Sequence, residues 1–426
     1  MGHIKDLISQ IDSDFYKVKF LEIYKDEKML EYQKKRYKAS LLKFADIYKE
    51  DDVNVFSAPG RSEVMGNHTD HQHGEILAAG INLDAIAVAK EYDDGLIKIV
   101  SGEYPMITVD TQAINEAGVN SGKSKALIEG VCKGFTDRGY KIGGFRAYIT
   151  SDVLIGAGLS SSAAFETLIG TILSNLYNDA KVPDKDIAIV GQFAENVYFG
   201  KPCGLMDQMA CSVGNLVHVD FSDPSDPVTE KIEYDLSANG YSLCITDTKG
   251  SHANLTDEYA AIPKEMKEIA SFFNKEVLLG VTMDDILNNA AELRQKFSDR
   301  AVLRAIHFIK ENERVRKGVK ALKENDTPAF MKLVRESGRS SFEYLQNVYS
   351  VKDVLTQNIS LALAISDVIL NEDESFRVHG GGFAGTIQAF VKNENVENYK
   401  NRMESVFGRD SCHILKIRKY GGIKVL

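Results

Sequence analysis

The pattern of apolar and polar positions divides the chain into three parts. Over about residues 1–50 apolar residues recur at helical spacing, which predicts helices on the outside of a core. From Val53 to about residue 155 short apolar runs are broken by glycines, as in strands that enter turns. Residues 160–178 and 184–199 have the caps and spacing of helices. The first half of the chain is therefore expected to hold a sheet with helices packed against it.

Residues 221–240 are polar, rich in turn-forming residues, and carry two of the eight prolines. This composition predicts a passage between domains, so we place two domains at residues 1–235 and 236–426. The second begins with a predicted strand at 241–246, continues as mostly amphipathic helix over 257–371, and ends in segments rich in glycine and β-branched residues. Helices that are segregated from strands predict an α+β fold rather than a doubly wound parallel sheet.

Composition narrows the class of protein. The 426 residues allow two to three domains, and 44% hydrophobic with 26% charged residues is typical of a folded protein. The formal net charge of -10 gives no overall attraction to nucleic acid or to an anionic membrane. No apolar run approaches the roughly 18 residues of a membrane span, and the N-terminus lacks the apolar core of a signal peptide. Five cysteines without a CxxC pair favour a reducing cytoplasm.

The segment Leu154–Ala164 is the strongest candidate for a phosphate-binding loop. Glycines allow backbone N–H groups to approach an anion, and the serines lie where the next helix begins, at the positive end of its dipole. Serine hydroxyls there can also bind Mg²⁺. An ordinary glycine turn with a serine cap is the alternative. The candidate residues are Gly156, Ala157, Gly158, Leu159, Ser160, Ser161 and Ser162.

Two other glycine-bearing segments are weaker candidates. Gly118–Ser124 resembles a Walker A loop, but it has three residues before its Gly-Lys pair where that motif needs four, so we expect a solvated loop. His379–Thr386 holds four glycines in eight residues. A turn from a strand into a helix explains this second segment equally well.

Asn67–His73 contains three histidines and an aspartate within seven residues. Imidazole and carboxylate are common metal ligands, but the spacing matches no tetrahedral zinc pattern. Polar groups that project from such a turn can equally bind the hydroxyls of a sugar, a task that needs directed donors and acceptors.

Asp207 and Glu195 are two further acidic candidates. Asp207 has apolar neighbours, so partial desolvation is expected to raise its proton affinity unless a cation lies beside it. Glu195 is expected on a helix that leads into the Asp207 loop. An exposed turn aspartate and a plain surface glutamate are the alternatives.

In their order and spacing these motifs resemble those of the GHMP kinases, and within them the galactokinase family. The resemblance rests on APGR…GNHTDHQHG, GAGLSSSAA, AEN…KPCGLMDQ and GGGFAGT, and it covers about residues 40–420. It implies two domains, the first like ribosomal protein S5 domain 2 and the second ferredoxin-like. ATP and the sugar are expected to meet in the cleft between them.

The resemblance also implies roles for individual residues. Residues 156–162 would cradle the ATP phosphates, and Ser161 or Ser162 would hold Mg²⁺ together with Glu195. Asp207 would accept the proton of the anomeric hydroxyl as that oxygen attacks the γ-phosphate, while Arg61 keeps Asp207 ionised and helps neutralise the phosphoryl group. The residues expected at the sugar are Arg61, Asn67, His68, Asp70, Gly204, Asp207 and Tyr259.

The chain departs from the family pattern in the sugar motif. Galactokinases usually read GRVNLIGEHTDY, whereas residues 60–71 read GRSEVMGNHTDH. Asn67 replaces a glutamate that contacts the sugar's 6-hydroxyl, which is expected to loosen the requirement for that hydroxyl and to remove a charge that would repel a 6-carboxylate. Glu63 and His71 also depart, as do His379 and Ala384 in the glycine-rich segment. After Tyr259 the usual asparagine and paired arginines are missing.

We therefore expect a cytoplasmic sugar 1-kinase that phosphorylates the C1 hydroxyl of galactose with MgATP. We expect it to act as a monomer without nucleic acid or membrane partners. The acidic chain can still bind a nucleotide, because the positive potential comes locally from helix-end amides, Mg²⁺ and Arg61. A kinase for galacturonate or another hexose is the alternative, favoured by Asn67 and by the Asp-His-Gln run at 70–72. A non-catalytic galactose sensor fits less well, because Ser162-Ala163, Arg61 and Asp207 are all present.

Overall fold

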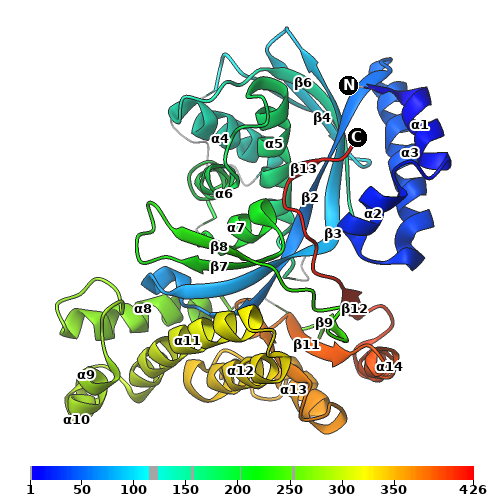
Figure 1. Cartoon of the computed structure of the whole chain (residues 1–426). Coiled ribbons are helices and arrows are strands. Elements are labelled where there is room, and N and C mark those ends of the chain that lie inside the picture. The colour runs from blue at the N-terminus through cyan, green and yellow to red at the C-terminus, as the bar shows by residue number, and fades with distance from the viewer. Residues whose placement is uncertain (1, 115–122, 155–157, 202, 252–254) are drawn as a thin grey trace.

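Two β-sheets, each covered by its own helices, build the protein (Figure 1). The architecture comes from a computed structural model, which describes residues 2–114, 123–154, 158–201, 203–251 and 255–426. Strands and helices are segregated as the apolar pattern predicted, so the α+β expectation is confirmed. Within the described residues, no helix is both long and apolar enough to cross a membrane.

The first sheet has nine strands, with the main order β1-β2-β3-β6-β4-β5. Neighbouring strands run antiparallel except β4 and β6, while β7 pairs with β3 and β8, and β13 pairs with β2. The strands are β1 (Gly2–His3), β2 (Asp52–Met65), β3 (Glu75–Tyr92), β4 (Leu96–Ser101), β5 (Ile107–Asp110), β6 (Gly144–Ser151), β7 (Leu216–Asp220), β8 (Val228–Ile232) and β13 (Ile423–Lys424).

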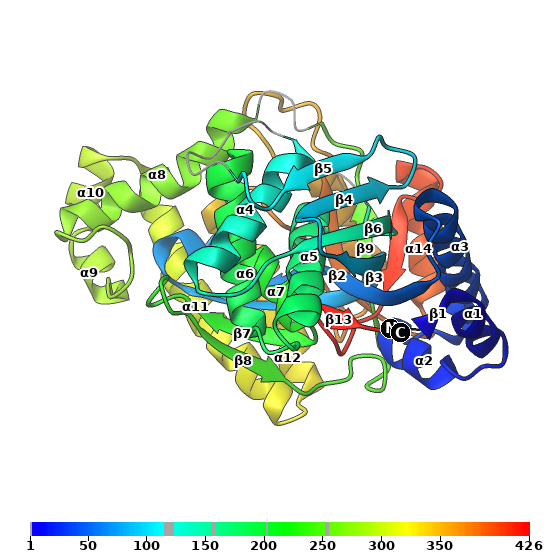
Figure 2. The same cartoon turned by 90° about the horizontal axis from the view of Figure 1, so that it is seen from above.

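Helices cover both faces of this sheet because its central strands alternate between two apolar faces. On β2, Val53 and Val55 pack against the N-terminal helices, whereas Phe56 and Ala58 pack against the helices of the other face. Figure 2 shows these two groups on opposite sides of β2 and β3. The first group is α1 (Ile4–Asp12), α2 (Lys17–Tyr24), η1 (Glu27–Met29) and α3 (Leu30–Tyr48); the second is α4 (Ser124–Asp137), α5 (Ser161–Tyr177), α6 (Asp184–Phe193), η3 (Ala194–Phe199) and α7 (Met206–Val213).

The second sheet has four antiparallel strands in the order β10-β11-β9-β12. Its strands are β9 (Tyr241–Asp247), β10 (Ser375–His379), β11 (Thr386–Lys392) and β12 (Cys412–Leu415). The helices of this part are α8 (Thr256–Phe272), α9 (Met283–Asn288), α10 (Ala290–Lys296), α11 (Asp299–Lys323), α12 (Thr327–Ser340), η4 (Ser341–Leu345), α13 (Asn358–Ile369) and α14 (Val396–Phe407). The mostly helical stretch predicted for residues 257–371 is therefore confirmed.

A shared apolar core joins the two parts. Strands β2 and β3 are long, and their far ends reach the second part of the molecule (Figure 1). There Met65 and Leu77 pack in one cluster with Val315 of α11 and Phe330 of α12. These same strand ends carry the sugar motif, so the motif lies where the two parts meet.

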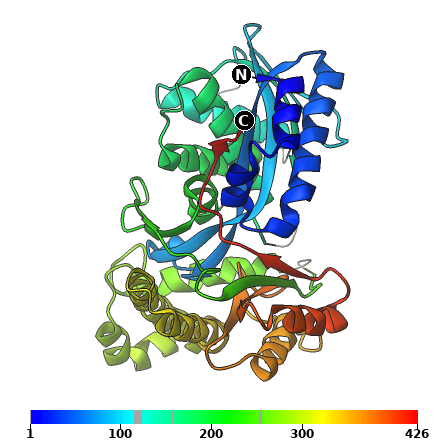
Figure 3. The ribbon, with the colours of Figure 1, turned by 45° about the vertical axis from the view of Figure 1, so that its right-hand side comes forward.

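The chain crosses from the first sheet to the second between β8 and β9, within residues 221–240. After β12 it turns back, and Figure 3 shows the last segment running along the first sheet, where β13 pairs with β2. We retain residues 1–235 and 236–426 as the proposed domains, with the last strand of the second returning to the first sheet.

Asp84 on β3 ties the N-terminal helices and the C-terminal segment to the first sheet. Its fully buried carboxylate accepts hydrogen bonds from Arg36 across 2.6 Å, Arg418 across 3.1 Å and the Tyr24 hydroxyl across 2.9 Å. Burial alone would raise the pKa of Asp84, but the two guanidinium groups lower it below its ordinary value. A buried carboxylate paired in this way is costly to leave without its partners.

Candidate active site

Arg61 on β2 and Asp207 on α7 form an ion pair at the junction of the two parts. The Arg61 guanidinium donates from Nε to Oδ1 of Asp207 across 2.6 Å, and a second nitrogen donates to the backbone carbonyl of Gly158. The backbone N–H of Arg61 also donates to the carbonyl of Leu159 across 3.1 Å. One arginine thus joins the candidate base to the loop before α5.

Asp207 is held in its ionised form by these neighbours. Burial alone would raise the pKa of Asp207, but the charge and hydrogen bond of Arg61, together with a hydrogen bond from the Ser160 hydroxyl, lower that pKa below its ordinary value. Ser160 adopts a left-handed backbone conformation with φ of 57°. Such a conformation is costly for a residue other than glycine, and it often marks a functional turn. Asp207 is therefore a carboxylate that can accept a proton.

The phosphate-loop candidates lie at the N-terminus of α5, which begins at Ser161. Gly156 and Ala157 fall outside the described residues. Gly158 has a φ of +67°, and a β-carbon there would lie 3.2 Å from Oγ1 of Thr386 on β11. The loop therefore packs closely against the second sheet, and the first turn of α5 offers its free N–H groups to an anion.

Glu195 is buried, so the alternative of a plain surface glutamate is wrong. It lies in η3, a π-helical segment that follows α6. Ser162 donates to its Oε1 across 3.0 Å, and the Lys201 ammonium lies 2.8 Å from the same oxygen. A hydroxyl and a carboxylate supply the oxygen ligands that Mg²⁺ prefers, so the Ser162–Glu195 pair fits that ion.

Three residues near Glu195 were missed by the sequence analysis. Gln208 donates to both Glu195, across 2.8 Å, and Glu166, across 3.1 Å, and Lys201 balances the charge of Glu195. Burial, followed by the charge of Glu195, holds the pKa of Glu166 well above its ordinary value. The signal for Glu166 was its position four residues after Ser162, which puts both side chains on one face of α5.

A cavity of about 720 Å³ opens beside the Arg61–Asp207 pair. Among the residues that line it are six of the seven expected at the sugar, namely Arg61, Asn67, His68, Asp70, Gly204 and Asp207. Tyr259 is not among them. Its hydroxyl donates across 2.8 Å to the carbonyl of Gly382, so Tyr259 supports the glycine-rich segment from behind.

The sugar motif forms a turn followed by the short helix η2 (Asp70–Gln72). Burial raises the pKa of Asp70 from 3.8 to about 6, and burial lowers the pKa of His68, which keeps that imidazole neutral. Nε2 of His68 lies 3.1 Å from the carbonyl of Gly381. Because a carbonyl can only accept, Nε2 carries the proton and Nδ1 remains an acceptor.

The glycine-rich segment 380–385 connects β10 to β11, so the alternative of a turn from a strand into a helix is wrong. Its backbone accepts a hydrogen bond from the sugar motif: Nδ2 of Asn67 donates to the carbonyl of Gly380 across 2.8 Å. His379, which departs from the family pattern, is buried between Ser62 and Thr386 with its ring nitrogens 3.1 and 3.0 Å from their hydroxyls. The segment therefore closes the cavity from the side of the second sheet.

Two other segments that the sequence singled out are the histidine-rich turn and the Walker-like loop. Across the described parts of the chain, no group of three or more His, Cys, Asp or Glu side chains could hold a metal ion. The metal-binding alternative for residues 67–73 therefore has no support from these residues. Of the Walker-like segment, residues 118–122 lie outside the described residues, and α4 begins at Ser124.

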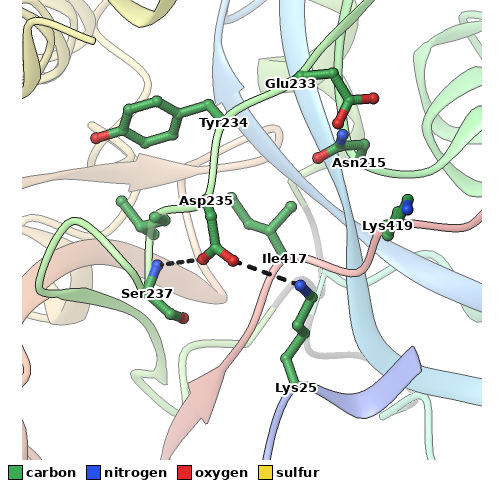
Figure 4. A pocket seen from close by; sticks show the side chains of 9 residues that line it. Lys25, Asn215, Glu233, Tyr234, Asp235, Ser237, Ile417 and Lys419 are labelled. Atoms are coloured by element: carbon green, nitrogen blue, oxygen red, sulfur yellow. Dashed lines mark hydrogen bonds and ion pairs between the residues drawn. The ribbon is translucent and has the colours of Figure 1, made fainter. Parts of the chain in front are cut away.

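A second cavity, of about 350 Å³, lies near the crossing between the two parts (Figure 4). There the Lys25 ammonium lies 3.4 Å from the Asp235 carboxylate, and Ile417 of the C-terminal segment forms another wall. None of the predicted site residues lines this cavity, so we assign the chemistry to the larger one.

Comparison with known proteins identifies the class that this fold and site define. Residues 126–215 match the GHMP kinases N terminal domain, and residues 42–91 match the galactokinase galactose-binding signature. A Glaesserella parasuis galactokinase is 32% identical over 350 residues, which covers 80% of this chain and 85% of that one. A Streptomyces coelicolor galactokinase is 28% identical over 365 residues, which covers 86% and 91% of the two chains. The protein belongs to the galactokinase family of the GHMP kinases.

Solved structures share the fold. A crystal structure of Lactococcus lactis galactokinase complexed with galactose superposes with a TM-score of 0.76 at 23% identity, over 90% of this chain and 98% of that one. A Methanococcus jannaschii mevalonate kinase superposes with a TM-score of 0.59 at 15% identity, over 86% and 98% of the two chains. The expected GHMP kinase fold is therefore confirmed.

Proposed function

We propose that the protein transfers the γ-phosphoryl group of ATP to the C1 hydroxyl of galactose, giving galactose 1-phosphate and ADP. The observation that carries this proposal is the Arg61–Asp207 ion pair, which lies between the phosphate-loop segment and the cavity. Membership in the galactokinase family and the match to the galactose-binding signature support galactose as the sugar.

Asp207 serves as the general base in this proposal. Its ionised carboxylate accepts the proton of the C1 hydroxyl as that oxygen attacks phosphorus. Arg61 keeps Asp207 ionised and lies beside the Gly158 carbonyl, so the same guanidinium can offset charge that develops on the transferred group. The low pKa makes Asp207 a weak base, so it acts by accepting the proton late, when the hydroxyl has already become more acidic.

The residues at the start of α5 would bind ATP. Gly158, Leu159 and Ser160 bring the chain to the first turn of α5, where backbone N–H groups can donate to phosphate oxygens. Ser162 and Glu195 would hold Mg²⁺, which when bound neutralises phosphate charge and orients the phosphates. Lys201 pairs with Glu195 and lines the cavity, so it would balance the charge of that site.

The residues of the sugar motif would bind the hydroxyls of the sugar. Asp70 offers a carboxylate and His68 a free ring acceptor, and both line the cavity. We propose a cytoplasmic location, which agrees with the five free cysteines, and a protein that acts as a monomer without nucleic acid or membrane partners. Tyr259 would act indirectly, because it supports the segment that closes the cavity.

A coupled ADP-release assay across a panel of hexoses tests this function. We expect turnover with galactose, and we expect Asp207→Asn to lower kcat by about 100-fold to 10,000-fold while ATP still binds. Ser160→Ala removes a hydrogen bond to Asp207 without removing the base, so it is the matched control and should lower kcat by about tenfold or less. If Asp207→Asn keeps a tenth of the rate, Asp207 is not the base. Galactose binding without any ADP release would instead indicate a sensor.

A further inference from the structure

Glu63 and Asn67 form a hydrogen-bonded pair in the wall of the larger cavity. Nδ2 of Asn67 donates to Oε1 of Glu63 across 3.0 Å, and both residues line the cavity. The chain departs from the GRVNLIGEHTDY pattern at both positions, with glutamate where asparagine is usual and asparagine where glutamate is usual. The pair therefore still holds one carboxylate, which is at position 63 instead of position 67.

Asn67 has no hydrogen bond left for a ligand. Its Nδ2 donates to Glu63 and to the carbonyl of Gly380, at 3.0 and 2.8 Å. Its Oδ1 accepts from Asn347 and Ser341, at 2.8 and 3.3 Å. An amide side chain offers two donors and two acceptor positions, and the protein occupies all of them.

Glu63, in contrast, has one oxygen available. Oε1 accepts from Asn67 and from the fully buried Arg377, whose Nη2 lies 2.8 Å away. Oε2 has no hydrogen bond to any residue in the described ranges. Since Glu63 lines the cavity, this oxygen can accept a hydrogen bond from a ligand there.

The position of Glu63 suits the end of a sugar that is remote from the reacting hydroxyl. Arg61, Ser62 and Glu63 pair in regular register with β3, so Arg61 and Glu63 point to the same face of β2. Two residues along a strand span about 7 Å, comparable with the width of a hexose ring. Arg61 contacts Asp207 at one end of this span, and Glu63 lies at the other.

The charges around Glu63 disfavour an anionic sugar. Arg377 is already paired with the Glu63 carboxylate. Arg61 and Lys201, the arginine and the lysine among the described residues that line the cavity, are also paired, with Asp207 and Glu195 respectively. A sugar carboxylate placed beside Oε2 would therefore meet a negative charge without a free cation to offset it.

We propose that Glu63 is a specificity-determining residue, whose Oε2 accepts a hydrogen bond from the sugar's 6-hydroxyl and so selects a neutral hexose over the corresponding hexuronate. This inference rests on the proposed sugar-kinase function. It reverses the expectation that the Asn67 substitution favours a 6-carboxylate, because the neighbouring Glu63 supplies the charge that Asn67 lacks.

Kinetics with three sugars on wild type and Glu63→Gln test the proposal. For wild type we expect kcat/KM to fall at least tenfold from galactose to 6-deoxygalactose, and at least 100-fold from galactose to galacturonate. Glu63→Gln removes the charge but keeps the size of the side chain. It should reduce the ratio of kcat/KM for galactose to kcat/KM for galacturonate at least tenfold. It should also reduce the difference in kcat/KM between galactose and 6-deoxygalactose.

Ser341→Ala is the matched control, because it removes one hydrogen bond to Asn67 and leaves Glu63 untouched. Its sugar ratios should stay within about twofold of wild type, and KM for ATP should not change in either variant. The proposal is overturned if galactose is turned over but Glu63→Gln leaves all ratios unchanged. If Glu63→Gln does not fold, wild-type turnover of galacturonate or 6-deoxygalactose as fast as galactose also overturns it. Absence of ADP release with every hexose would refute the proposed function itself.

Discussion

A β-carbon on Gly204 would lie 1.8 Å from Oδ2 of Asp70. No two non-bonded heavy atoms approach so closely, so the backbone at position 204 fixes where the Asp70 carboxylate stands. Asp70 comes from the sugar motif after β2, and Gly204 from the loop before α7. The close approach joins two segments that are far apart in the chain into one wall of the cavity.

Gly204→Ala is therefore expected to displace Asp70 and to raise KM for the sugar at least tenfold, with a smaller effect on KM for ATP. Initial-rate kinetics in both substrates measure these changes. In an Asp70→Ala background the carboxylate is gone, so Gly204→Ala should raise KM for the sugar only slightly further. Equal losses in both backgrounds would show that the two positions act independently.

Ser162 and Ser161 are expected to differ in their effect on Mg²⁺ binding. The Ser162 hydroxyl is the one that donates to Glu195. Ser162→Ala should thus raise the Mg²⁺ concentration for half-maximal rate at least fivefold, and Ser161→Ala should change it less than twofold. Titration of the rate with MgCl₂ at fixed ATP gives these values. A larger effect at Ser161 would move the proposed Mg²⁺ ligand to that residue.

The sugar step should lose activity in mild acid because of Asp70. Its pKa of about 6, raised by burial, means that the carboxylate is mostly ionised at pH 7 and mostly protonated at pH 5. Protonation replaces an acceptor with a donor, so kcat/KM for the sugar should fall about tenfold between these pH values. The pKa of Asp207 is lowered, so Asp207 stays ionised over this range.

A pH profile of kcat/KM for the sugar checks this assignment. In Asp70→Asn the decline near pH 6 should disappear, although the overall rate is lower. A decline that persists unchanged in Asp70→Asn would assign it to another group.

Loss of the Asp84 carboxylate should lower the free energy of unfolding without changing the active site directly. Asp84→Asn removes the negative charge from between Arg36 and Arg418, which leaves the buried Arg418 without a carboxylate and Arg36 with Asp152 alone, and about 3–5 kcal/mol of stability should be lost. Asp152→Asn is the matched control, because Asp152 also contacts Arg36, at 2.9 Å, but is 17% exposed. The stability lost in Asp152→Asn should stay below about 1 kcal/mol. Urea unfolding of the three proteins measures the difference, and equal losses would contradict the central role of Asp84.

Much of the fold was predictable because its signals are local. The helical spacing of residues 1–50, the strands that begin after Val53 and the helix that begins near Ser160 all depend on near neighbours in the chain. The turn at 380–385 was recognised from its glycines, but glycines alone do not determine whether a helix or a strand comes after a turn. The alternating apolar positions from Thr386 to Val391 carry the signal for a strand.

The site was predictable only in part. Residue types and order indicated Arg61, Asp207 and the phosphate loop, whereas the state of each side chain depends on partners far away in the sequence. Arg377 reaches Glu63 across 314 positions, and Gly380 accepts from Asn67 across 313. These contacts use the hydrogen-bonding groups of Asn67 and leave Oε2 of Glu63 available to a ligand. No local pattern contains this information, because tertiary packing creates it.

Identification of the reaction product by ³¹P NMR tests the central claim most directly. Purified protein with galactose, ATP and Mg²⁺ should give one sugar phosphate, whose phosphorus couples to the anomeric proton. The same mixture with Asp207→Asn should give almost none. A phosphate on any other oxygen, or consumption of ATP without a sugar phosphate, would contradict the proposed reaction.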